Sequence, residues 1–130
     1  MNTLHKSERL TNKTLFEELV SSDFSFVQYP FRMIAKESSL TGDYPARIAI
    51  SISKKKFKRA VHRNRLKRLT REVFRCNKSL LYDTVPAGLT IDILFIYLDN
   101  RIATFPKVEK VLQTALPKIA RHFSNLPAHD

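Results

Sequence analysis

Hydrophobic and polar residues alternate along several short stretches of the chain, as they do in half-buried β-strands. The alternation covers residues 24–28 and 31–36, and Pro30 between them favours a sheet edge or a bend. Residues 47–53 form the clearest predicted strand, with its isoleucines on one face. An apolar run at residues 89–98 predicts one more strand. The pattern therefore predicts a sheet of four strands.

Other stretches have the three- and four-residue spacing of amphipathic helices. The first is short and covers residues 15–20, where Thr14 and Glu17 can form a capping box. The second begins at about residue 59 and should end before the turn-forming residues 86–88. Both are expected to pack their apolar sides on the sheet.

A third predicted helix begins at residues 104–106, with Pro106 in its first turn. Pro117 should kink or split this helix, because proline lacks the backbone N–H that an interior turn needs. The apolar side chains of the helix form one stripe that should face the core: Val108, Val111, Leu112, Ala115, Leu116, Ile119 and Phe123.

The resulting order, α-β-β-β-α-β-α, predicts an α+β fold with its helices packed on the sheet. A length of 130 residues with 43% hydrophobic content suits one core, so residues 1–130 are expected to form a single domain. Only residues 1–8 and 125–130 have the character of frayed ends.

Positive charge is concentrated in the second predicted helix and the residues just before it. The formal net charge is +11, and eleven of the 22 residues from Lys54 to Arg75 are lysine or arginine, with Glu72 as the only acid. Helical spacing gathers one set of side chains on a side that should face the core: His62, Leu66, Leu69 and Val73. The opposite side and its flanks carry Arg63, Asn64, Arg65, Lys67, Arg68, Arg71 and Arg75. Glu72 has the spacing to pair with Arg68 or Arg75.

A helix with one cationic side suits a polyanion. A charge run is most often a merely solvated surface, but solvated helices usually mix both signs to form ion pairs, and this one scarcely does. Nucleic acid is therefore the favoured partner. Membrane binding is disfavoured, because the apolar side of the helix is short and includes His62.

The rest of the composition restricts the cellular setting. Cys76 is the only cysteine, so no internal disulfide can form, which fits a reducing compartment. The first ten residues contain no apolar run of signal-peptide length, and residues 91–98 are too few to span a bilayer. A cytoplasmic protein without membrane contact is expected.

No catalytic residue or metal site is expected in the protein itself. A metal nuclease needs several carboxylates or histidines that converge on an ion, whereas the twelve acids are scattered and the four histidines lack ligand-like spacing. Gly42 and Gly88 are the only glycines, so the chain has no glycine-rich phosphate loop and no predicted small-molecule substrate.

A longer motif in the basic region resembles one protein family. Ser53-Lys54-Lys55 and Arg59-Ala60 follow the strand at residues 47–53 and precede the run Arg63-Asn64-Arg65-Leu66-Lys67-Arg68-Leu69-Thr70-Arg71-Glu72-Val73-Phe74. This motif closely resembles the signature of the protein subunit of bacterial ribonuclease P. The order and spacing of the predicted elements are similar to that family along nearly the whole chain.

The resemblance implies a ribonucleoprotein that removes the 5′ leader from precursor transfer RNA, with a catalytic centre made by RNA and Mg²⁺. The implied partners are the catalytic RNA and the precursor transfer RNA, and the protein itself would hold no cofactor. The resemblance also implies a mixed sheet with a left-handed crossover through the basic helix, against the usual right-handed rule. It assigns these residues to the catalytic RNA: Arg59, Arg63, Asn64, Arg65, Lys67, Arg68 and Arg71.

The resemblance further implies a cleft between the first helix and the sheet that holds the single-stranded leader. The residues that match it by position are Phe16, Val20, Arg32, Ile34, Ser51, Ser53, Lys54 and Lys55. Phe16 is explained equally well as a base-stacking aromatic or as a core aromatic. Ser51, Ser53, Lys54 and Lys55 can contact leader phosphates, or they simply form an exposed strand face with a charged end. Val20, Arg32 and Ile34 stand where the family is often more aromatic, so apolar contact and Arg32 are expected to replace stacking.

Some alternatives stay open at this point. Asp92 and Asp99 stand where the family often has basic residues, which weakens the case for RNA contact there. A ribosomal or general RNA-binding protein would bind RNA without promoting leader removal. A nuclease in its own right would cleave RNA alone, and a DNA-reading helix is a weaker option because no paired recognition unit is evident.

Overall fold

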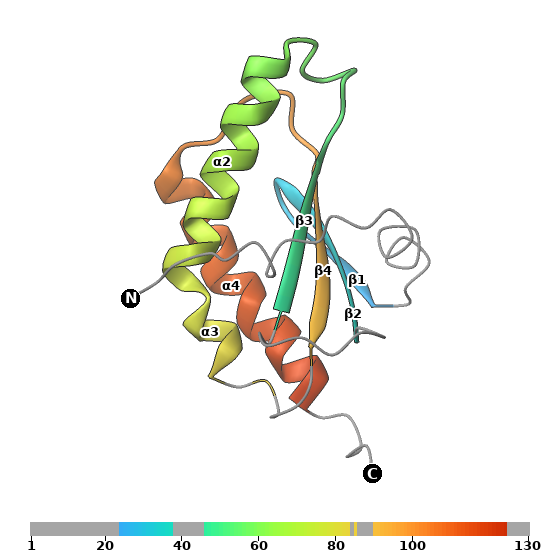
Figure 1. The fold of residues 1–130 in the computed structure, drawn as a ribbon, viewed down its shortest axis with the longest axis vertical. Helices are drawn as coiled ribbons and strands as arrows, with labels where there is room; N and C mark the ends of the chain where they lie inside the picture. Colours follow the sequence, from blue (N-terminus) through green and yellow to red (C-terminus); the bar gives the residue numbers. More distant parts are fainter. Residues whose placement is uncertain (1–23, 38–45, 84, 86–89, 125–130) are drawn as a thin grey trace.

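The fold is seen in a computed structural model that describes residues 24–37, 46–83, 85 and 90–124 (Figure 1). The helix predicted at residues 15–20 lies outside the described residues, and so do the two predicted frayed ends. Each of the other predicted helices and strands is present.

Four strands form one sheet in the order β1-β2-β4-β3. β1 (Ser25–Gln28) and β2 (Phe31–Glu37) make an antiparallel hairpin, with Pro30 in the turn at the sheet edge. β2 also pairs antiparallel with β4 (Ile91–Tyr97), whereas β3 (Ala46–Ile52) pairs parallel with β4. The predicted four-stranded mixed sheet is confirmed.

The helices lie together on one side of this sheet (Figure 1). α2 (Ala60–Asn77) and the short α3 (Ser79–Tyr82) connect β3 to the parallel strand β4, and α4 (Phe105–Ser124) follows β4. The basic helix was expected to end before residues 86–88, and α2 does end at Asn77, with the unpredicted short helix α3 after it. The Asn77 side chain donates a hydrogen bond to the Val73 carbonyl at 2.9 Å, and such local bonds compete with helix continuation. The left hand of the crossover stays a prediction.

The core lies between the sheet and α2 and α4. Alternate side chains of the two central strands point into it and are nearly inaccessible: Phe31, Met33, Ala35, Ile91, Ile93, Phe95 and Tyr97. The predicted stripe of α4 is confirmed, because all of its side chains are at most 7% exposed. Ile48 and Ile52 of β3 join the same cluster, as expected from the shared face of that strand. This apolar layer fixes how α2 and α4 lie on the sheet.

α4 continues through Pro117 as a single helix, so the residue does not split it, and the other predicted effect, a kink, stays a prediction. An interior proline costs a helix about 3 kcal/mol, because one backbone hydrogen bond is lost and the ring crowds the preceding turn. Leu116 and Ile119 on either side of Pro117 are fully buried. Burial of two such side chains contributes roughly 1.5–3 kcal/mol each, which is enough to offset the proline.

Replacing Pro117 with alanine should therefore raise the free energy of unfolding, by roughly 1–2 kcal/mol once the greater freedom of the unfolded chain is subtracted. Urea titration followed by circular dichroism measures this change. Lys110→Ala, at an exposed position of the same helix, is the matched control and should have little effect. A Pro117→Ala chain that is less stable than the original would show that packing of the proline ring outweighs the missing hydrogen bond.

Candidate nucleic-acid interface

One side of α2 is packed into the core. Leu66 and Val73 are fully buried and Leu69 is half-buried, as the helical spacing predicts. The prediction for His62 is wrong, because this residue is exposed. Leu66 is the first buried residue of α2, so the first helical turn extends past the core and leaves the imidazole in water. Phe74, which was not assigned to this side, is fully buried.

The opposite side of α2 presents cations to solvent. We define the basic face of α2 as Asn64, Arg65, Lys67 and Arg68 together with Arg59 just before the helix; Lys67 is half-buried and the others are exposed. Within the described part of the chain, none of these side chains forms a hydrogen bond or an ion pair. The cations near the first turn of α2 lie at the positive end of the helix dipole. The first turn contains no acidic residue that would offset this positive charge. A surface of this kind is stabilised by an anionic partner.

Glu72 neutralises one neighbouring arginine of α2. Arg75 donates to the Glu72 carboxylate through Nε at 3.0 Å and through Nη2 as well. This hydrogen bond from Arg75 is the main reason why the pKa of Glu72 is lowered. No ion pair links Glu72 to Arg68, although the spacing allows one. The charge of the Arg68 guanidinium group is therefore not compensated by Glu72, whereas that of Arg75 is.

The chain between β3 and α2 forms a lysine loop, defined as residues 53–58. The Ser53 hydroxyl accepts the Lys55 N–H at 3.1 Å, and the Ser53 carbonyl accepts the Phe57 N–H at 3.1 Å. Phe57 is buried, with its ring 5.9 Å from the ring of Tyr97. Lys54 and Lys55 are exposed at the tip of the loop. The loop is thus anchored at one aromatic residue and holds two predicted contact residues in solvent.

Arg63 ties this loop to α2. Its Nη1 group donates to the Phe57 carbonyl at 2.6 Å and to the Lys58 carbonyl at 3.0 Å. Arg63 is half-buried, unlike its exposed neighbours Asn64 and Arg65. One residue of the predicted RNA-binding set therefore has a structural contact in the protein alone. Arg71, another member of that set, is half-buried on α2.

The strands bring together the described members of the predicted leader cleft. The second face of the sheet is the side that points away from α2 and α4. On this face Arg32 of β2 lies beside Ile96 of β4, and Ile96 lies beside Ser51 of β3. In the next row Ile34 lies beside Leu94, and both are buried in a small apolar cluster. Arg32, Ile34 and Ser51 therefore share one face, with the lysine loop at the end of β3.

Phe16 and Val20, the other predicted members of the cleft, lie outside the described residues. Ser53 is exposed at the start of the lysine loop, and its hydroxyl already shapes that loop. The structure thus gathers six of the eight predicted leader-binding residues around one face and one end of the sheet: Arg32, Ile34, Ser51, Ser53, Lys54 and Lys55.

The acidic residues that depart from the family pattern accept hydrogen bonds from partners within the protein. Asp92 lies on the second face and accepts two hydrogen bonds from Arg47, at 2.8 and 3.0 Å. The carboxylate is buried and its partner is partly exposed, so the charge of Asp92 is compensated within the protein. Asp99 accepts the backbone N–H of Asn100 at 2.7 Å. Sequence reasoning missed Arg47, because a pair of residues 45 positions apart gives no local signal.

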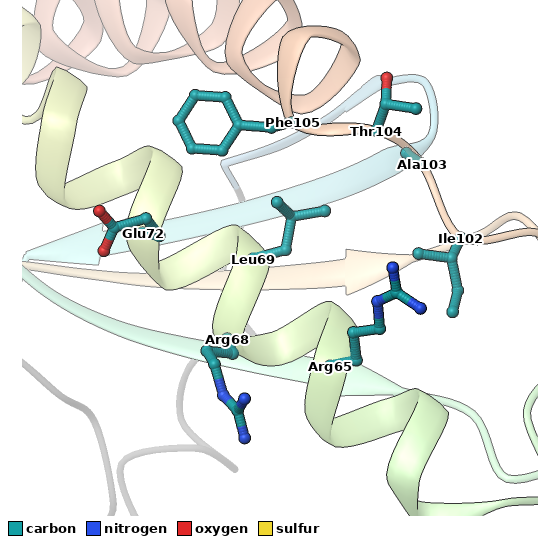
Figure 2. A pocket seen from close by; sticks show the side chains of 8 residues that line it. All are labelled: Arg65, Arg68, Leu69, Glu72, Ile102, Ala103, Thr104 and Phe105. Carbon is teal, nitrogen blue, oxygen red and sulfur yellow. The ribbon is translucent and has the colours of Figure 1, made fainter.

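A pocket of about 600 Å³ adjoins the basic face, between α2 and the start of α4 (Figure 2). Arg65, Arg68, Leu69 and Glu72 line it from α2, and residues 102–105 line it from the other side. Sequence reasoning missed this site too, because its two sides come from segments about thirty residues apart and neither contains a recognisable motif.

Within the described residues, neither a metal-binding cluster nor a membrane-spanning helix is present. They contain no group of three or more histidine, cysteine, aspartate or glutamate residues arranged to hold a metal ion. Among the helices in this part of the chain, none is both long and apolar enough to cross a membrane.

Comparison with known sequences gives a consistent result. A family model described as ribonuclease P matches residues 4–120 of this chain. A ribonuclease P protein component of Porphyromonas gingivalis is 35% identical over 126 residues, which cover 96% of this chain and 90% of that protein. One from Pseudomonas putida is 48% identical over 62 residues, which cover 48% of this chain and 41% of that protein.

Comparison with solved structures extends this similarity to the fold. The structure of the ribonuclease P protein from Staphylococcus aureus matches with a TM-score of 0.68 and 27% identity, over 91% of this chain and 99% of that chain. The protein from Thermotoga maritima matches with a TM-score of 0.67 and 27% identity, over 85% of this chain and 96% of that chain. The similarity first seen in the basic motif thus covers most of the chain.

The contacts of Arg63 lead to a testable difference between two arginines of α2. Arg63→Met should loosen the lysine loop, because bonds from a charged donor contribute about 1.5–3 kcal/mol each. Hydrogen exchange of the Phe57 amide should become about tenfold faster or more. Arg65→Met removes the same charge without a described hydrogen bond and should leave that exchange rate unchanged. Equal rates in the two variants would assign Arg63 to the RNA contact alone.

Proposed function

This chain belongs to the family of bacterial ribonuclease P protein components, the protein subunits of a ribonucleoprotein endonuclease that processes transfer RNA, and we propose that it binds two RNAs on separate surfaces. The basic face of α2, with Arg63 and Arg71 beside it, binds the catalytic RNA. The second face of the sheet and the lysine loop bind the 5′ leader of precursor transfer RNA.

The observation that supports this proposal best is the basic face of α2, whose cations are uncompensated within the described residues. Arg65 and Arg68 are exposed on a helix that is anchored by the fully buried Leu66 and Val73. A guanidinium group can hold a phosphate with two parallel hydrogen bonds or stack on a base. Asn64 can donate and accept at a base edge or at a ribose hydroxyl. The helix therefore offers both charge and shape recognition.

The chemistry of leader removal gives these cations a role without any catalytic residue in the protein. Two RNA molecules repel each other, and a cationic domain placed between them lowers the free energy of bringing them together. Less Mg²⁺ is then needed for the same population of complex. Hydrolysis of the phosphodiester bond is assigned to the catalytic RNA and its Mg²⁺, and the protein positions the substrate. Precursor transfer RNA is made in the bacterial cytoplasm, so we expect this protein to act there.

The leader surface combines an apolar floor with positive ends. Ile34 and Leu94 form the buried floor of the second face, and Arg32 is exposed beside them. Lys54 and Lys55 extend the charge past the end of β3. Phe16 and Val20 are proposed to contact the leader as well, and this assignment rests only on their positions in the sequence. The exposed cations around this buried floor suit a single strand whose phosphates contact them.

The decisive test is single-turnover cleavage of a 5′-extended precursor transfer RNA by the partner catalytic RNA at low Mg²⁺, with and without this protein. The protein should raise the rate. Arg65→Gln and Arg68→Gln should each weaken binding of the catalytic RNA by about 1–3 kcal/mol and make its salt dependence shallower by about one phosphate contact. Filter binding across a series of salt concentrations measures both quantities.

The matched control is Arg75→Gln, on the same helix, because Arg75 is already paired with Glu72. It should change affinity and salt dependence much less. RNA binding without stimulation of cleavage would assign the chain to another ribonucleoprotein, such as a ribosomal particle. Cleavage by the protein alone would contradict the assignment of catalysis to RNA.

A second prediction concerns the leader surface. Arg32→Gln should weaken binding of leader-bearing precursor by about 1–2 kcal/mol, because one exposed cation on the second face is lost. Binding of mature transfer RNA, which has no leader, should not change. Lys110→Gln on α4, which lies on the opposite side of the sheet, serves as the control. An equal loss for both RNAs would place Arg32 outside the leader contact.

A further inference from the structure

The pocket between α2 and residues 102–105 has the dimensions of a ligand site. Its volume of about 600 Å³ lies within the range of roughly 300–1,000 Å³ that is typical of small-molecule sites. Leu69 of α2 and Phe105 of α4 line it from its two sides (Figure 2). The pocket also adjoins the proposed contact surface for the catalytic RNA, since Arg65 and Arg68 belong to both.

The walls of this pocket are apolar but not closed. Leu69, Ile102, Ala103 and Phe105 all pack against the main core, yet each remains half-buried. Their accessible apolar surface lies beside a strongly cationic helix face. A flat ring that entered the pocket would cover this surface and gain both apolar burial and contact with an aromatic side chain.

The rim of the pocket is polar, and its charges differ from one end to the other. Arg65 extends toward Ile102, and Glu72 lies two helical turns further along α2 (Figure 2). Arg65 forms no ion pair with a described residue, whereas Glu72 is held by Arg75. The hydrogen bond from Arg75 lowers the pKa of Glu72, so this rim carries a carboxylate at neutral pH. One end therefore attracts an anion, and the other accepts hydrogen bonds.

The wall opposite α2 is held in place before any ligand arrives. The Tyr97 hydroxyl donates to the Arg101 carbonyl and accepts the Ala103 N–H at 3.1 Å. Burial raises the pKa of Tyr97, which keeps the hydroxyl protonated and able to donate. The Val108 N–H bonds to the Thr104 carbonyl at 3.0 Å, so this segment leads directly into α4. A preformed wall lowers the entropic cost of binding.

We propose that this pocket receives the base of one unpaired nucleotide of the catalytic RNA, with the base between Leu69 and Phe105 and its phosphate on Arg65. The inference rests on the proposed function, because it supplies a base contact beside the phosphate contacts of α2. Bases in loops and bulges of RNA are already unstacked, so their insertion into a protein pocket costs little. The Glu72 carboxylate favours a base with an exocyclic amino group over uracil, which has none.

The first test uses the full chain with labelled methyl groups and mononucleotides in solution. Adenosine 5′-monophosphate should shift the nuclear magnetic resonance signals of Leu69, Ile102 and Ala103. Ribose 5-phosphate should bind at least about fivefold more weakly, because the stacking contribution of the base is missing. Uridine 5′-monophosphate should fall between them. Equal shifts from ribose 5-phosphate and adenosine 5′-monophosphate would reduce the pocket to an anion site and overturn the proposal.

A variant that fills the pocket gives the second test. Ala103→Leu keeps the backbone contact with Tyr97 and occupies part of the space, so it should abolish the shifts caused by adenosine 5′-monophosphate. Its affinity for the catalytic RNA should fall by about fivefold or more with an unchanged salt dependence, because a base contact releases no counterions. Thr114→Leu, an exposed site on α4, is the control. Thermal melting confirms that both variants fold.

Failure of this inference can be told apart from failure of the proposed function. If the unsubstituted protein stimulates cleavage while Ala103→Leu binds the catalytic RNA normally, the pocket proposal is wrong and the proposed function stands. If the unsubstituted protein gives no stimulation, the proposed function fails whatever the pocket binds. Should Ala103→Leu unfold, the mononucleotide titration of the unsubstituted chain decides alone, since it needs no variant.

Discussion

Burial of one side of α2 is the constraint on which the rest of the structure depends. Leu66, Val73 and Phe74 are fully inaccessible between the sheet and α4, and each contributes roughly 1.5–3 kcal/mol to folding. The helix cannot rotate without losing these contacts, so the opposite side must carry its cations in solvent. The repulsion among the cations is thus tolerated because the apolar side holds the helix in place. A partner with negative charge removes that repulsion.

The arrangement of the elements separates two surfaces. The helices cover one side of the sheet (Figure 1). The strand registers place Arg32, Ile34 and Ser51 on the other side. The lysine loop joins the two at the end of β3, where Phe57 anchors it and Arg63 connects it to α2. If two RNAs bind as proposed, this small domain can contact both at once without their competing for one site.

Local patterns were sufficient for the four strands and for the existence and buried side of α2 and α4. The alternation in β2 and β3 and the stripe of α4 predicted buried positions correctly, because burial on a regular element repeats with its period. The same reasoning was wrong for His62, since periodicity gives the direction of a side chain but not how far the core extends along the helix. It was wrong again for a split at Pro117, because the apolar contacts around that residue come from other elements.

The sequence by itself determined the sheet and helices, the cationic side of α2 and, through a contiguous motif, the family. All of these are encoded by residues close together in the chain, where spacing and composition can be read directly. Only the tertiary structure decided which charges remain available: Arg75 is paired with Glu72, Arg63 binds the lysine loop, and Asp92 is compensated by Arg47. The pocket beside Arg65 is likewise formed only by the tertiary structure. The physical reason is that pairing and cavities depend on distances between segments, which strand register and helix packing set.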